Sequence, residues 1–450
     1  MDPTTLNELA AACGGRLLRG DGATTVSNVN KDTRTLQRGD LYWALRGDNH
    51  DGHDFVRQAA DRGAAAAVVE SGDTDAPAGF PLIVVPDALR ALQQLAAWWR
   101  RQLTLKVICL TGSNGKTSTK DFAASVAATR FRVNKTEGNL NNHIGLPLTV
   151  LSARKSDEVG VWEIGMNHPG EIEPLARLAQ PDIAIITNIG VAHIEFLGSR
   201  EAIAREKGVL GEVLGPDQVL LLPVGDDFAP SLASRTKARV VFVGADDALH
   251  ADNRRVSARG HDFDLVLGPE RTAAHLPVPG EHMVRNALLA VAAGLELGLS
   301  LRECASGLAV TKLSARRLAC LDVRGVTGLD DSYNANPDSM EAALHALRGL
   351  PGGGRRFAVL GRMGELGAYA REGYCRVGRT AASTMDVLIT VGEETSPLAE
   401  QAQAGGIEVH RVADTSGAAR LLRELARPGD AVVVKGSRGA RMERVLEEFA

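Results

Sequence analysis

The chain lacks a strong net charge of either sign. Its 51 lysines and arginines nearly balance 55 aspartates and glutamates, which leaves a formal net charge of −4 at pH 7. Proteins whose main partner is a polyanion such as DNA carry a basic surface, so this balance gives no reason to expect nucleic acid. Local basic residues can still bind a small phosphorylated substrate.

Long hydrophobic runs are also missing. No apolar stretch approaches the roughly 20 residues that a helix needs to span a membrane. The segment Met1-Asp2-Pro3-Thr4-Thr5 has neither the basic nor the apolar region of a signal peptide. We therefore expect no membrane span and no secretion signal.

Cysteine is scarce, and its spacing argues against two common uses. The five cysteines are scattered without a C-x-x-C pair: Cys13, Cys109, Cys304, Cys320 and Cys375. An odd, scattered set forms neither a disulfide framework nor a zinc site. We expect buried thiols in a reducing cytoplasm.

What is present is the composition of a globular protein, with 44% hydrophobic, 24% charged and 4% aromatic residues. A chain of 450 residues is too long for one ordinary core, so two or three domains are expected. Helical spacing of Leu92, Leu95, Ala96 and Trp99 predicts a helix from residue 88 to about 103.

Apolar runs that are typical of buried strands occur along the whole chain. They lie at 64–69, 82–85, 107–110, 159–164, 183–186, 219–222, 357–360, 387–391 and 431–434. From 107 onward they alternate with helical stretches, which predicts the α/β class with a doubly wound parallel sheet. An arginine-rich junction at 312–317 precedes a smaller Rossmann-like part. The expected domains are residues 1–86, 87–313 and 314–450.

The most informative segment is Thr111-Gly112-Ser113-Asn114-Gly115-Lys116-Thr117-Ser118, directly after an apolar run. The N–H groups of such a turn, a helix N-terminus and the Lys116 ammonium can hold a triphosphate, while Thr117 can ligate Mg²⁺. The loop is shorter than the Walker pattern, whose first glycine would fall at Leu110. The alternative is a tight turn with a solvated lysine. Its place between strand and helix favours nucleotide binding.

Glu163 is a candidate ligand for the same metal. It lies at the end of an apolar strand, and parallel sheets bind ligands at the carboxyl ends of their strands. It could share a Mg²⁺ with Thr117, because Mg²⁺ takes few protein ligands beside phosphate oxygens and water. A helix cap or an ordinary ion pair is the alternative.

Two further residues carry weaker signals. His193 follows the strand at 183–186, but a lone histidine is more often a hydrogen-bonded structural residue. Lys207 lies on a predicted helix, where a lysine is solvated by default. The spacing alone does not single out either residue for metal binding.

Two polar clusters allow both a structural and a functional interpretation. Asn139-Leu140-Asn141-Asn142 is typical of a turn or helix cap, yet its amides could also hold polar substrate groups. The segment 330–337 is either a helix-start loop or a nucleotide contact, with Asp331 on a ribose hydroxyl. Glycines 361, 364 and 367 spell G-x-x-G-x-x-G, which is not the dinucleotide pattern, so no NAD site is inferred.

Together these segments resemble the Mur ligase family, the ATP-dependent amide ligases of peptidoglycan precursor synthesis. The resemblance extends over essentially the whole chain. The matching strings are T-G-S-N-G-K-T-S at 111–118, G-N-L-N-N-H-I-G at 138–145, E-I-G-M-N-H-P-G-E-I at 163–172, A-H-I-E-F-L-G-S at 192–199, K-G at 207–208, P-G-E-H-M-V-R-N-A at 279–287, D-D-S-Y-N-A-N-P at 330–337 and K-G-S-R at 435–438.

The resemblance implies a role for each of these positions. The lysine that matches Lys207 is carbamylated in the family, as an N6-carboxylysine, and with His193 it helps to bind a second Mg²⁺. Glu163 and Thr117 belong to the first Mg²⁺, and the implied catalytic set is Lys116, Glu163, His193 and Lys207. The implied ATP site comprises Gly112, Ser113, Asn114, Gly115, Lys116, Thr117, Ser118, His282, Asn286, Arg317 and Asp331. The implied substrate contacts are Thr33, Arg34, Asn139, Asn141, Asn142, Tyr333, Asn336, Lys435, Ser437 and Arg438.

The resemblance also implies a fold and a reaction. A small α/β domain would bind a UDP-linked substrate, a central P-loop-type sheet would bind ATP, and a C-terminal Rossmann-like domain would bind the incoming dipeptide. The last two strings favour the member that joins D-alanyl-D-alanine to UDP-N-acetylmuramoyl-tripeptide through an acyl phosphate. A monomeric cytoplasmic enzyme of cell-wall synthesis is expected, which leaves open whether the tripeptide ends in lysine or diaminopimelate.

The chain departs from the family pattern at several points. Arg362 stands where related ligases carry an acid, so no role of that acid transfers to this chain. Ser314-Ala315-Arg316-Arg317 replaces the usual P-G-R, which shifts the register of the functional arginine. The D-N-P-R signature of the sibling that adds a diamino acid is absent. The rivals are a folylpolyglutamate-type ligase and a non-catalytic nucleotide-binding module.

Overall fold

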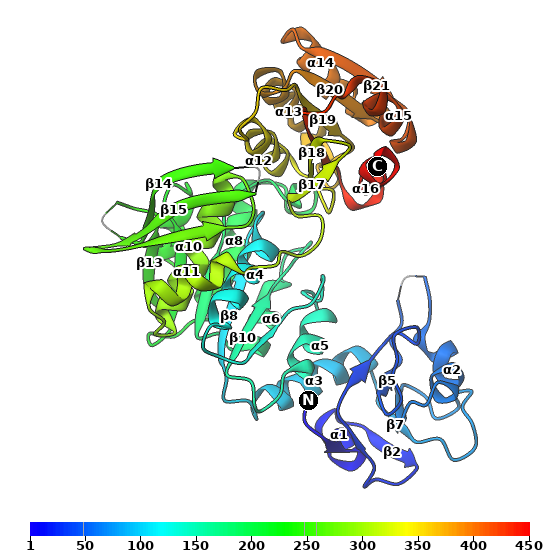
Figure 1. Cartoon of the computed structure of the whole chain (residues 1–450). Helices are drawn as coiled ribbons and strands as arrows, with labels where there is room; N and C mark the ends of the chain where they lie inside the picture. The colour runs from blue at the N-terminus through cyan, green and yellow to red at the C-terminus, as the bar shows by residue number, and fades with distance from the viewer. Residues whose placement is uncertain (48, 247, 258) are drawn as a thin grey trace. The chain divides into compact units, whose positions relative to one another are not determined.

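The computed structural model describes residues 1–47, 49–246, 248–257 and 259–450 (Figure 1). The chain folds into two compact units. The first unit comprises Met1–Cys109, Phe131–Met166 and Glu171–Asp182, and the second comprises Leu110–Arg130, Asn167–Gly170 and Ile183–Ala450.

The N-terminal part of the first unit is a five-stranded sheet in the order β2-β7-β6-β5-β4. Its strands are β2 (Arg16–Arg19), β4 (Val29–Asn30), β5 (Leu41–Trp43), β6 (Ala66–Val69) and β7 (Leu82–Val84). β4 to β7 are parallel and β2 is antiparallel. The strands predicted at 64–69 and 82–85 are thus confirmed as β6 and β7. The smaller elements are β1 (Thr4–Thr5), α1 (Leu6–Ala12), β3 (Thr25–Val26) and α2 (Val56–Asp61).

Helix α3 (Ala88–Arg100) begins where Asp87 caps it, because the Asp87 side chain accepts a hydrogen bond from the Arg90 N–H at 2.8 Å. The four residues expected on its apolar face, from Leu92 to Trp99, are all buried. Trp99 Nε1 donates to the Ala153 carbonyl at 2.8 Å, so α3 packs on α5 (Gly145–Ser152). The first unit also contains β9 (Val133–Lys135), β10 (Val159–Glu163) and α6 (Ile172–Ala179).

The central strands follow the order β13-β12-β11-β8-β10-β9. β8 (Lys106–Thr111) has its first four residues in the first unit and its last two in the second. In the second unit, β11 (Ile183–Ile186), β12 (Val219–Pro223) and β13 (Arg239–Val243) are parallel neighbours. The helices of this part are α4 (Lys116–Ala127), α7 (Ile194–Leu197), α8 (Arg200–Glu212), α9 (Ala229–Ala233), α10 (Glu281–Glu296) and α11 (Leu301–Ala309).

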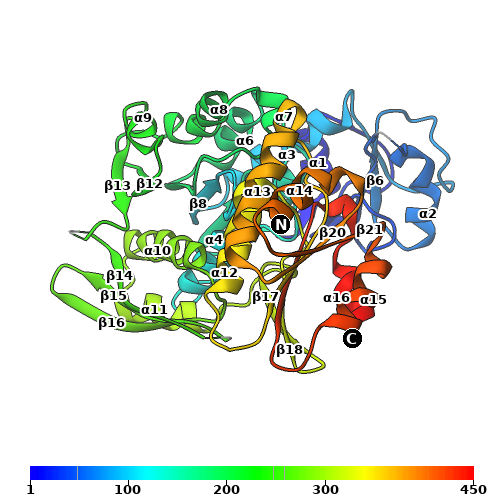
Figure 2. The same ribbon diagram turned by 90° about the horizontal axis from the view of Figure 1, so that it is seen from above.

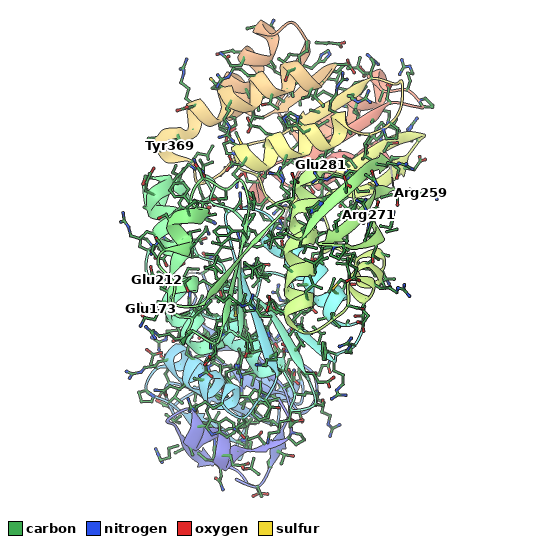
Figure 3. All side chains as sticks on the ribbon, turned by 90° about the vertical axis from the view of Figure 1, so that its left-hand side faces the viewer. Glu173, Glu212, Arg259, Arg271, Glu281 and Tyr369 are labelled. Atoms are coloured by element: carbon green, nitrogen blue, oxygen red, sulfur yellow. The ribbon has the colours of Figure 1, made fainter. Side chains whose placement is uncertain are left out.

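A three-stranded antiparallel sheet in the second unit was not predicted. It consists of β14 (His250–Ser257), β15 (Gly260–Leu267) and β16 (Glu270–Leu276). Arg271, labelled in Figure 3, pairs with Asp252 and Asp264, each at 2.9 Å. Charged residues break the apolar run that predicts a buried strand, so cross-strand ion pairs of this kind are not visible in the sequence pattern.

The C-terminal part of the second unit is a six-stranded sheet in the order β17-β18-β22-β19-β20-β21. Its strands are β17 (Ala319–Val323), β18 (Val326–Asp330), β19 (Arg356–Leu360), β20 (Val387–Val391), β21 (Glu408–Val412) and β22 (Ala431–Lys435). Only β17 pairs antiparallel. The helices are α12 (Pro337–Arg348), α13 (Ala370–Thr384), α14 (Ser396–Ala404), α15 (Thr415–Leu425) and α16 (Glu443–Phe449). Figure 2 shows α15 and α16 on one side of these strands and α12 and α13 on the other, as a doubly wound sheet requires.

Two expectations from the composition have different outcomes. Among the described residues, no helix is both long and apolar enough to cross a membrane. The prediction of buried thiols holds for Cys13, Cys109 and Cys304, but it is wrong for Cys320, which is exposed, and for half-buried Cys375. Cys320 is exposed because it lies on the antiparallel edge strand β17.

Candidate active site

The glycines of the loop after β8 are required by its geometry. Gly112 has φ +151°, and a Cβ on it would lie 1.9 Å from Thr187 Oγ1. Gly115 has the left-handed φ of +79°, and a Cβ there would lie 2.6 Å from Asn286 Oδ1. A side chain at either position would therefore collide with a neighbour, and at Gly115 it would also strain the backbone.

The segment after β11 holds in place the loop at residues 111–118, which we call the phosphate loop. The Asn114 N–H donates to Asn188 Oδ1 at 2.8 Å, and the Gly190 N–H donates to Ser113 Oγ at 2.9 Å. Thr187 Oγ1 donates to the Asn114 carbonyl at 2.5 Å. The loop is thus preorganised by a neighbouring strand end.

Lys116 is the first residue of α4, and its ammonium folds over the loop. Its Nζ donates to the Gly112 carbonyl at 2.8 Å and lies 3.4 Å from the Ser113 carbonyl. The next residue, Thr117, is buried, and its hydroxyl accepts a hydrogen bond from Arg317 at 3.1 Å. A cation, a hydroxyl and a helix N-terminus therefore meet where an anion can bind.

Further side chains come from Arg317 just before β17, from the segment between β18 and α12, and from Arg438 after β22. The Arg317 guanidinium lies 3.9 Å from the Tyr333 ring centre, and that of Arg438 lies 5.8 Å from it. Asn336 donates to Asn114 Oδ1 at 2.8 Å and also caps α12. The second unit thus brings together Arg317, Tyr333 and Asn336 beside the phosphate loop.

Asp331 and Lys435 form a buried ion pair, with Nζ 2.5 Å from Oδ2. The Leu318 N–H donates to the other Asp331 oxygen at 3.2 Å. Burial lowers the pKa of Lys435, and the attraction of Asp331 opposes that shift. Each carboxylate oxygen keeps a further lone pair for a ribose hydroxyl. Ser437 donates through its N–H and its hydroxyl to the Arg362 carbonyl, at 2.9 and 2.7 Å.

Helix α10 contributes His282 and Asn286. The pKa of His282 is lowered to about 3, first by burial and then by the cations Arg285 and Lys435. Its imidazole is therefore neutral at pH 7. Asn286 is buried with its amide against Gly115. Both residues suit hydrogen bonding to a nucleotide without adding charge.

His193 and Lys207 share one electrostatic environment in the second unit. Lys207, on α8, is fully buried. Burial lowers the pKa of His193. The nearby cations Lys116 and Lys207 lower it further, whereas Glu365 raises it. His193 Nδ1 lies 2.5 Å from Glu365 Oε2. The structure therefore places Lys116, His193 and Lys207 near one another.

In the first unit, Glu163 ends β10 as predicted and is buried. Its carboxylate accepts from Asn141 Nδ2 at 2.8 Å, and its N–H donates to Thr136 Oγ1 at 2.9 Å. Asn142 accepts from the Gly145 N–H at 2.9 Å, so it holds the start of α5. The Asn139 carbonyl accepts from the Asn141 N–H at 2.8 Å within the same turn.

Near the N-terminus, Thr33 is buried and Arg34 is exposed. The Thr33 hydroxyl donates to Gln58 Oε1 at 2.6 Å. Arg34 pairs with Asp32 at 2.6 Å, and its side chain is 84% exposed. Arg34 is therefore accessible to an anionic ligand, whereas the Thr33 hydroxyl already has a partner.

Two site residues were missed by sequence reasoning. Glu365 meets His193, and Asp338 accepts from the Val191 N–H at 2.9 Å, where a Cβ on Gly190 would lie 2.1 Å from Asp338 Oδ2. Both acids are distant in sequence from the residues they meet. In the sequence, the glycine-rich string at 361–367 was a signal for Glu365. In the structure, Glu365 has a left-handed φ of +59°.

The donor atoms fit magnesium better than a transition metal. Among the residues that the structure describes, no group of three or more His, Cys, Asp or Glu side chains forms a ready metal centre. Mg²⁺ needs few protein ligands, and the Thr117 hydroxyl and the Glu163 carboxylate are hard oxygen donors. The family resemblance implies a carbamate on Lys207, and the structure buries this side chain fully on α8.

Comparison with known proteins identifies the family. Three family models match: the Mur ligase family catalytic domain over residues 25–100, the Mur ligase middle domain over 110–294, and the Mur ligase glutamate ligase domain over 316–438. A UDP-N-acetylmuramoyl-tripeptide–D-alanyl-D-alanine ligase of Bacillus subtilis is 38% identical, over 95% of this chain and 93% of its own. The chain belongs to the Mur ligase family.

Solved structures agree with this assignment. A crystal structure of MurF from Acinetobacter baumannii has a TM-score of 0.90 at 32% identity, covering 100% of this chain and 99% of that one. The MurF ligase of Thermotoga maritima in complex with ADP has a TM-score of 0.82 at 26% identity, covering 94% and 97%. The predicted family, α/β fold class and three-domain Mur ligase architecture are confirmed.

Proposed function

We propose that this Mur ligase uses ATP to join D-alanyl-D-alanine to UDP-N-acetylmuramoyl-tripeptide, a step of peptidoglycan precursor synthesis. One observation carries the proposal: the B. subtilis relative with that printed name matches nearly the full length of both chains at 38% identity. The phosphate loop, with Lys116 folded over it, supports the use of ATP.

The proposed reaction proceeds in two steps. An oxygen of the tripeptide's terminal carboxylate attacks the γ-phosphorus of ATP, and the bond to ADP breaks. The dipeptide amine then attacks the acyl phosphate carbon, loses a proton, and expels inorganic phosphate. The Lys116 ammonium and the loop N–H groups offset the negative charge of the transferring phosphoryl group.

The metal sites remain predictions. Thr117 and Glu163 are the residues expected to hold one Mg²⁺, and His193 with carbamylated Lys207 the second. Bound Mg²⁺ would supply further positive charge to the phosphates. What supports these roles is the hard oxygen donors of the first pair and the common electrostatic environment of the second.

The division of labour along the chain is also a proposal. Residues 1–86 would bind the UDP moiety, with Thr33 and Arg34 as contacts; 87–313 would bind ATP; and 314–450 would bind the dipeptide. Tyr333, Lys435, Ser437 and Arg438 are the proposed contacts in the last domain. We expect a cytoplasmic monomer, and movement of the last domain would exclude water from the acyl phosphate.

Phosphate release tests the proposal. The protein is assayed with ATP, Mg²⁺ and UDP-N-acetylmuramoyl-tripeptide, together with D-alanyl-D-alanine, single amino acids or no amine. We expect release that depends on the dipeptide and disappears in Lys116→Ala, with Lys106→Ala as a matched control, since Lys106 pairs with Asp182 on the surface. Release with a single amino acid would instead indicate a sibling or folylpolyglutamate-type ligase. ATP binding without release would indicate a binding module.

A further inference from the structure

The start of α12 makes two hydrogen bonds to the matched middle domain. Asp338 Oδ2 accepts from the Val191 N–H at 2.9 Å. Two residues earlier, Asn336 Nδ2 donates to Asn114 Oδ1 of the phosphate loop at 2.8 Å. Val191 and Asn114 belong to the matched middle domain, and α12 belongs to the matched last domain. Both contacts lie within the second unit, so they join the two domains beside the phosphate loop.

The segment that Asp338 binds is the one that supports the phosphate loop. The Gly190 N–H donates to Ser113 Oγ at 2.9 Å, and the Ser113 N–H donates to the Asn188 carbonyl at 3.0 Å. The Asn114 N–H donates to Asn188 Oδ1 at 2.8 Å. A displacement of this segment would therefore move the partners that hold the loop in its conformation.

Gly190 leaves room for the Asp338 carboxylate. A Cβ on Gly190 would lie 2.1 Å from Asp338 Oδ2, whereas the nearest atom outside Asp338 is Ser113 Cβ, at an ordinary contact distance of 3.4 Å. The backbone of Gly190 is not in the left-handed region, unlike that of Gly115, so an alanine would fit its conformation. Asp338 is therefore the one described residue with which a methyl group at position 190 would collide.

The second oxygen of the same carboxylate faces the last domain. Arg376, on α13, donates to Asp338 Oδ1 and lies 2.8 Å from Glu341 Oε2. Glu341 lies one turn further along α12, and among the described residues it makes no hydrogen bond or ion pair with the segment 188–191. Asp338 thus bridges α13 and the middle domain, whereas Glu341 binds within the last domain alone.

We propose that Asp338 is a positioning residue that fixes the segment 188–191, and through it the phosphate loop, while the last domain makes this contact. Asp338 acts through the Val191 N–H. The affinity for ATP is then coupled to the docking of the last domain, because both favour the same conformation of the loop. The proposal rests on the proposed function in that the loop binds ATP. An ion pair that only stabilises the fold would not change the affinity for ATP.

The test compares Asp338→Ala with Glu341→Ala as the matched control. Both variants lose an ion pair between α12 and Arg376, but only Asp338→Ala also removes the acceptor of the Val191 N–H. Calorimetric titration of the full-length protein with ATP and Mg²⁺, without the other substrates, measures the affinity. Thermal unfolding of each variant reports whether it folds.

We expect Asp338→Ala to weaken ATP binding by at least about fivefold, the lower end of typical coupling between sites. Glu341→Ala should bind ATP as the wild type does, although its thermal midpoint falls. Wild-type ATP affinity in folded Asp338→Ala would overturn the proposal. Equal losses of ATP affinity in the two variants would overturn it as well, because the cause would then be the pairing with Arg376.

Gly190→Ala provides a second, independent variant. Its methyl group would displace the Asp338 carboxylate, so ATP binding should weaken as in Asp338→Ala. The double variant Gly190→Ala/Asp338→Ala has room for the methyl group and should bind ATP no more weakly than Asp338→Ala alone. Losses that add up in the double variant would overturn the proposal. If Asp338→Ala does not fold, wild-type ATP affinity in Gly190→Ala would overturn it equally.

Phosphate release separates this proposal from the proposed function. In Asp338→Ala we expect a higher KM for ATP, with most of kcat kept at saturating ATP. A lower kcat with an unchanged KM for ATP would contradict the positioning role. Absence of dipeptide-dependent release in the wild type would instead reject the proposed function, whereas the ATP titrations would still decide on Asp338.

Discussion

At the scale of single residues, the candidate site gathers cationic groups around the place for a triphosphate. Lys116 and Lys207 both lie close enough to His193 to lower its pKa. Positive charge at this place would attract the phosphate oxygens of a nucleotide. Carbamylation of Lys207 would replace its positive charge by a negative one that Mg²⁺ can bind.

Lys207→Ala tests the proposed carbamylation. We expect turnover to fall by at least about 100-fold, since an electrostatic group of the active site is lost, and to recover partly with bicarbonate or short carboxylates. The exposed Lys237→Ala serves as control. Carbamylation itself is detected by ¹³C NMR with ¹³CO₂. Full activity of Lys207→Ala without additives would exclude the role.

His282 gives a prediction about pH. Its pKa is lowered from 6.5 to about 3 in the folded protein, so the unfolded chain binds a proton more readily as the pH falls. The stability contributed by neutral His282 is therefore complete above about pH 6.5 and is lost as the pH falls toward 3. Between pH 8 and 5, the thermal midpoint of the wild type should fall more than that of His282→Gln.

The control for this measurement is His345→Gln, because His345 is exposed on α12. Its variant should follow the wild type across the same range. Identical pH slopes for the wild type and His282→Gln would show that the imidazole is not kept neutral by burial.

At the scale of elements, the strand–loop–helix unit of β8, the phosphate loop and α4 depends on the glycine at position 115. Gly115 combines a left-handed backbone with an approach of 2.6 Å to Asn286. Gly225 has a similar φ of +88°, but a Cβ on it would meet no atom within 4 Å. A side chain at position 225 would therefore cause backbone strain alone, whereas one at position 115 would cause both strain and a collision with Asn286.

We expect Gly115→Ala to weaken ATP binding by at least about tenfold, since strain of about 1–3 kcal/mol is joined by displacement of Asn286. Gly225→Ala should show the strain as a lower thermal midpoint while ATP affinity stays unchanged. Calorimetric titration with ATP and thermal unfolding measure the two effects. Equal ATP affinities in both variants would show that a side chain at position 115 does not displace Asn286.

At the scale of the whole molecule, the second unit contains most of the middle matched domain and all of the last one, and several side chains connect them. Arg317 reaches back to Thr117 beside the phosphate loop, and Asn336 reaches Asn114. The neighbouring Arg316 turns the other way and pairs with Glu443 at 2.8 Å. The sequence had left the register of the functional arginine uncertain, and the structure places Arg317 at the loop.

Arg317→Ala should therefore weaken ATP binding, by about 10- to 100-fold if a charge-assisted hydrogen bond of about 1.5–3 kcal/mol is lost. Arg316→Ala should lower thermal stability and leave ATP affinity near that of the wild type. Titration of both variants with ATP decides between them. A larger loss in Arg316→Ala would reverse the assignment.

The sequence by itself determined the elements whose signals are local. A strand such as β11 is a continuous apolar run, and the phosphate loop needs glycines at fixed positions, so both can be recognised without knowledge of distant residues. The family followed from the same local strings. The antiparallel sheet β14–β16 was missed because its cross-strand ion pairs have no periodic signature.

Only the tertiary structure decided which distant side chains meet. His193 carried a weak signal alone, and Glu365 carried almost none, yet they lie 2.5 Å apart. The full burial of Lys207 on α8 and the turn of Arg317 toward Thr117 are likewise consequences of packing. Local sequence fixes backbone conformation through sterics and hydrophobic periodicity, whereas contacts between residues far apart in the chain depend on how whole elements pack.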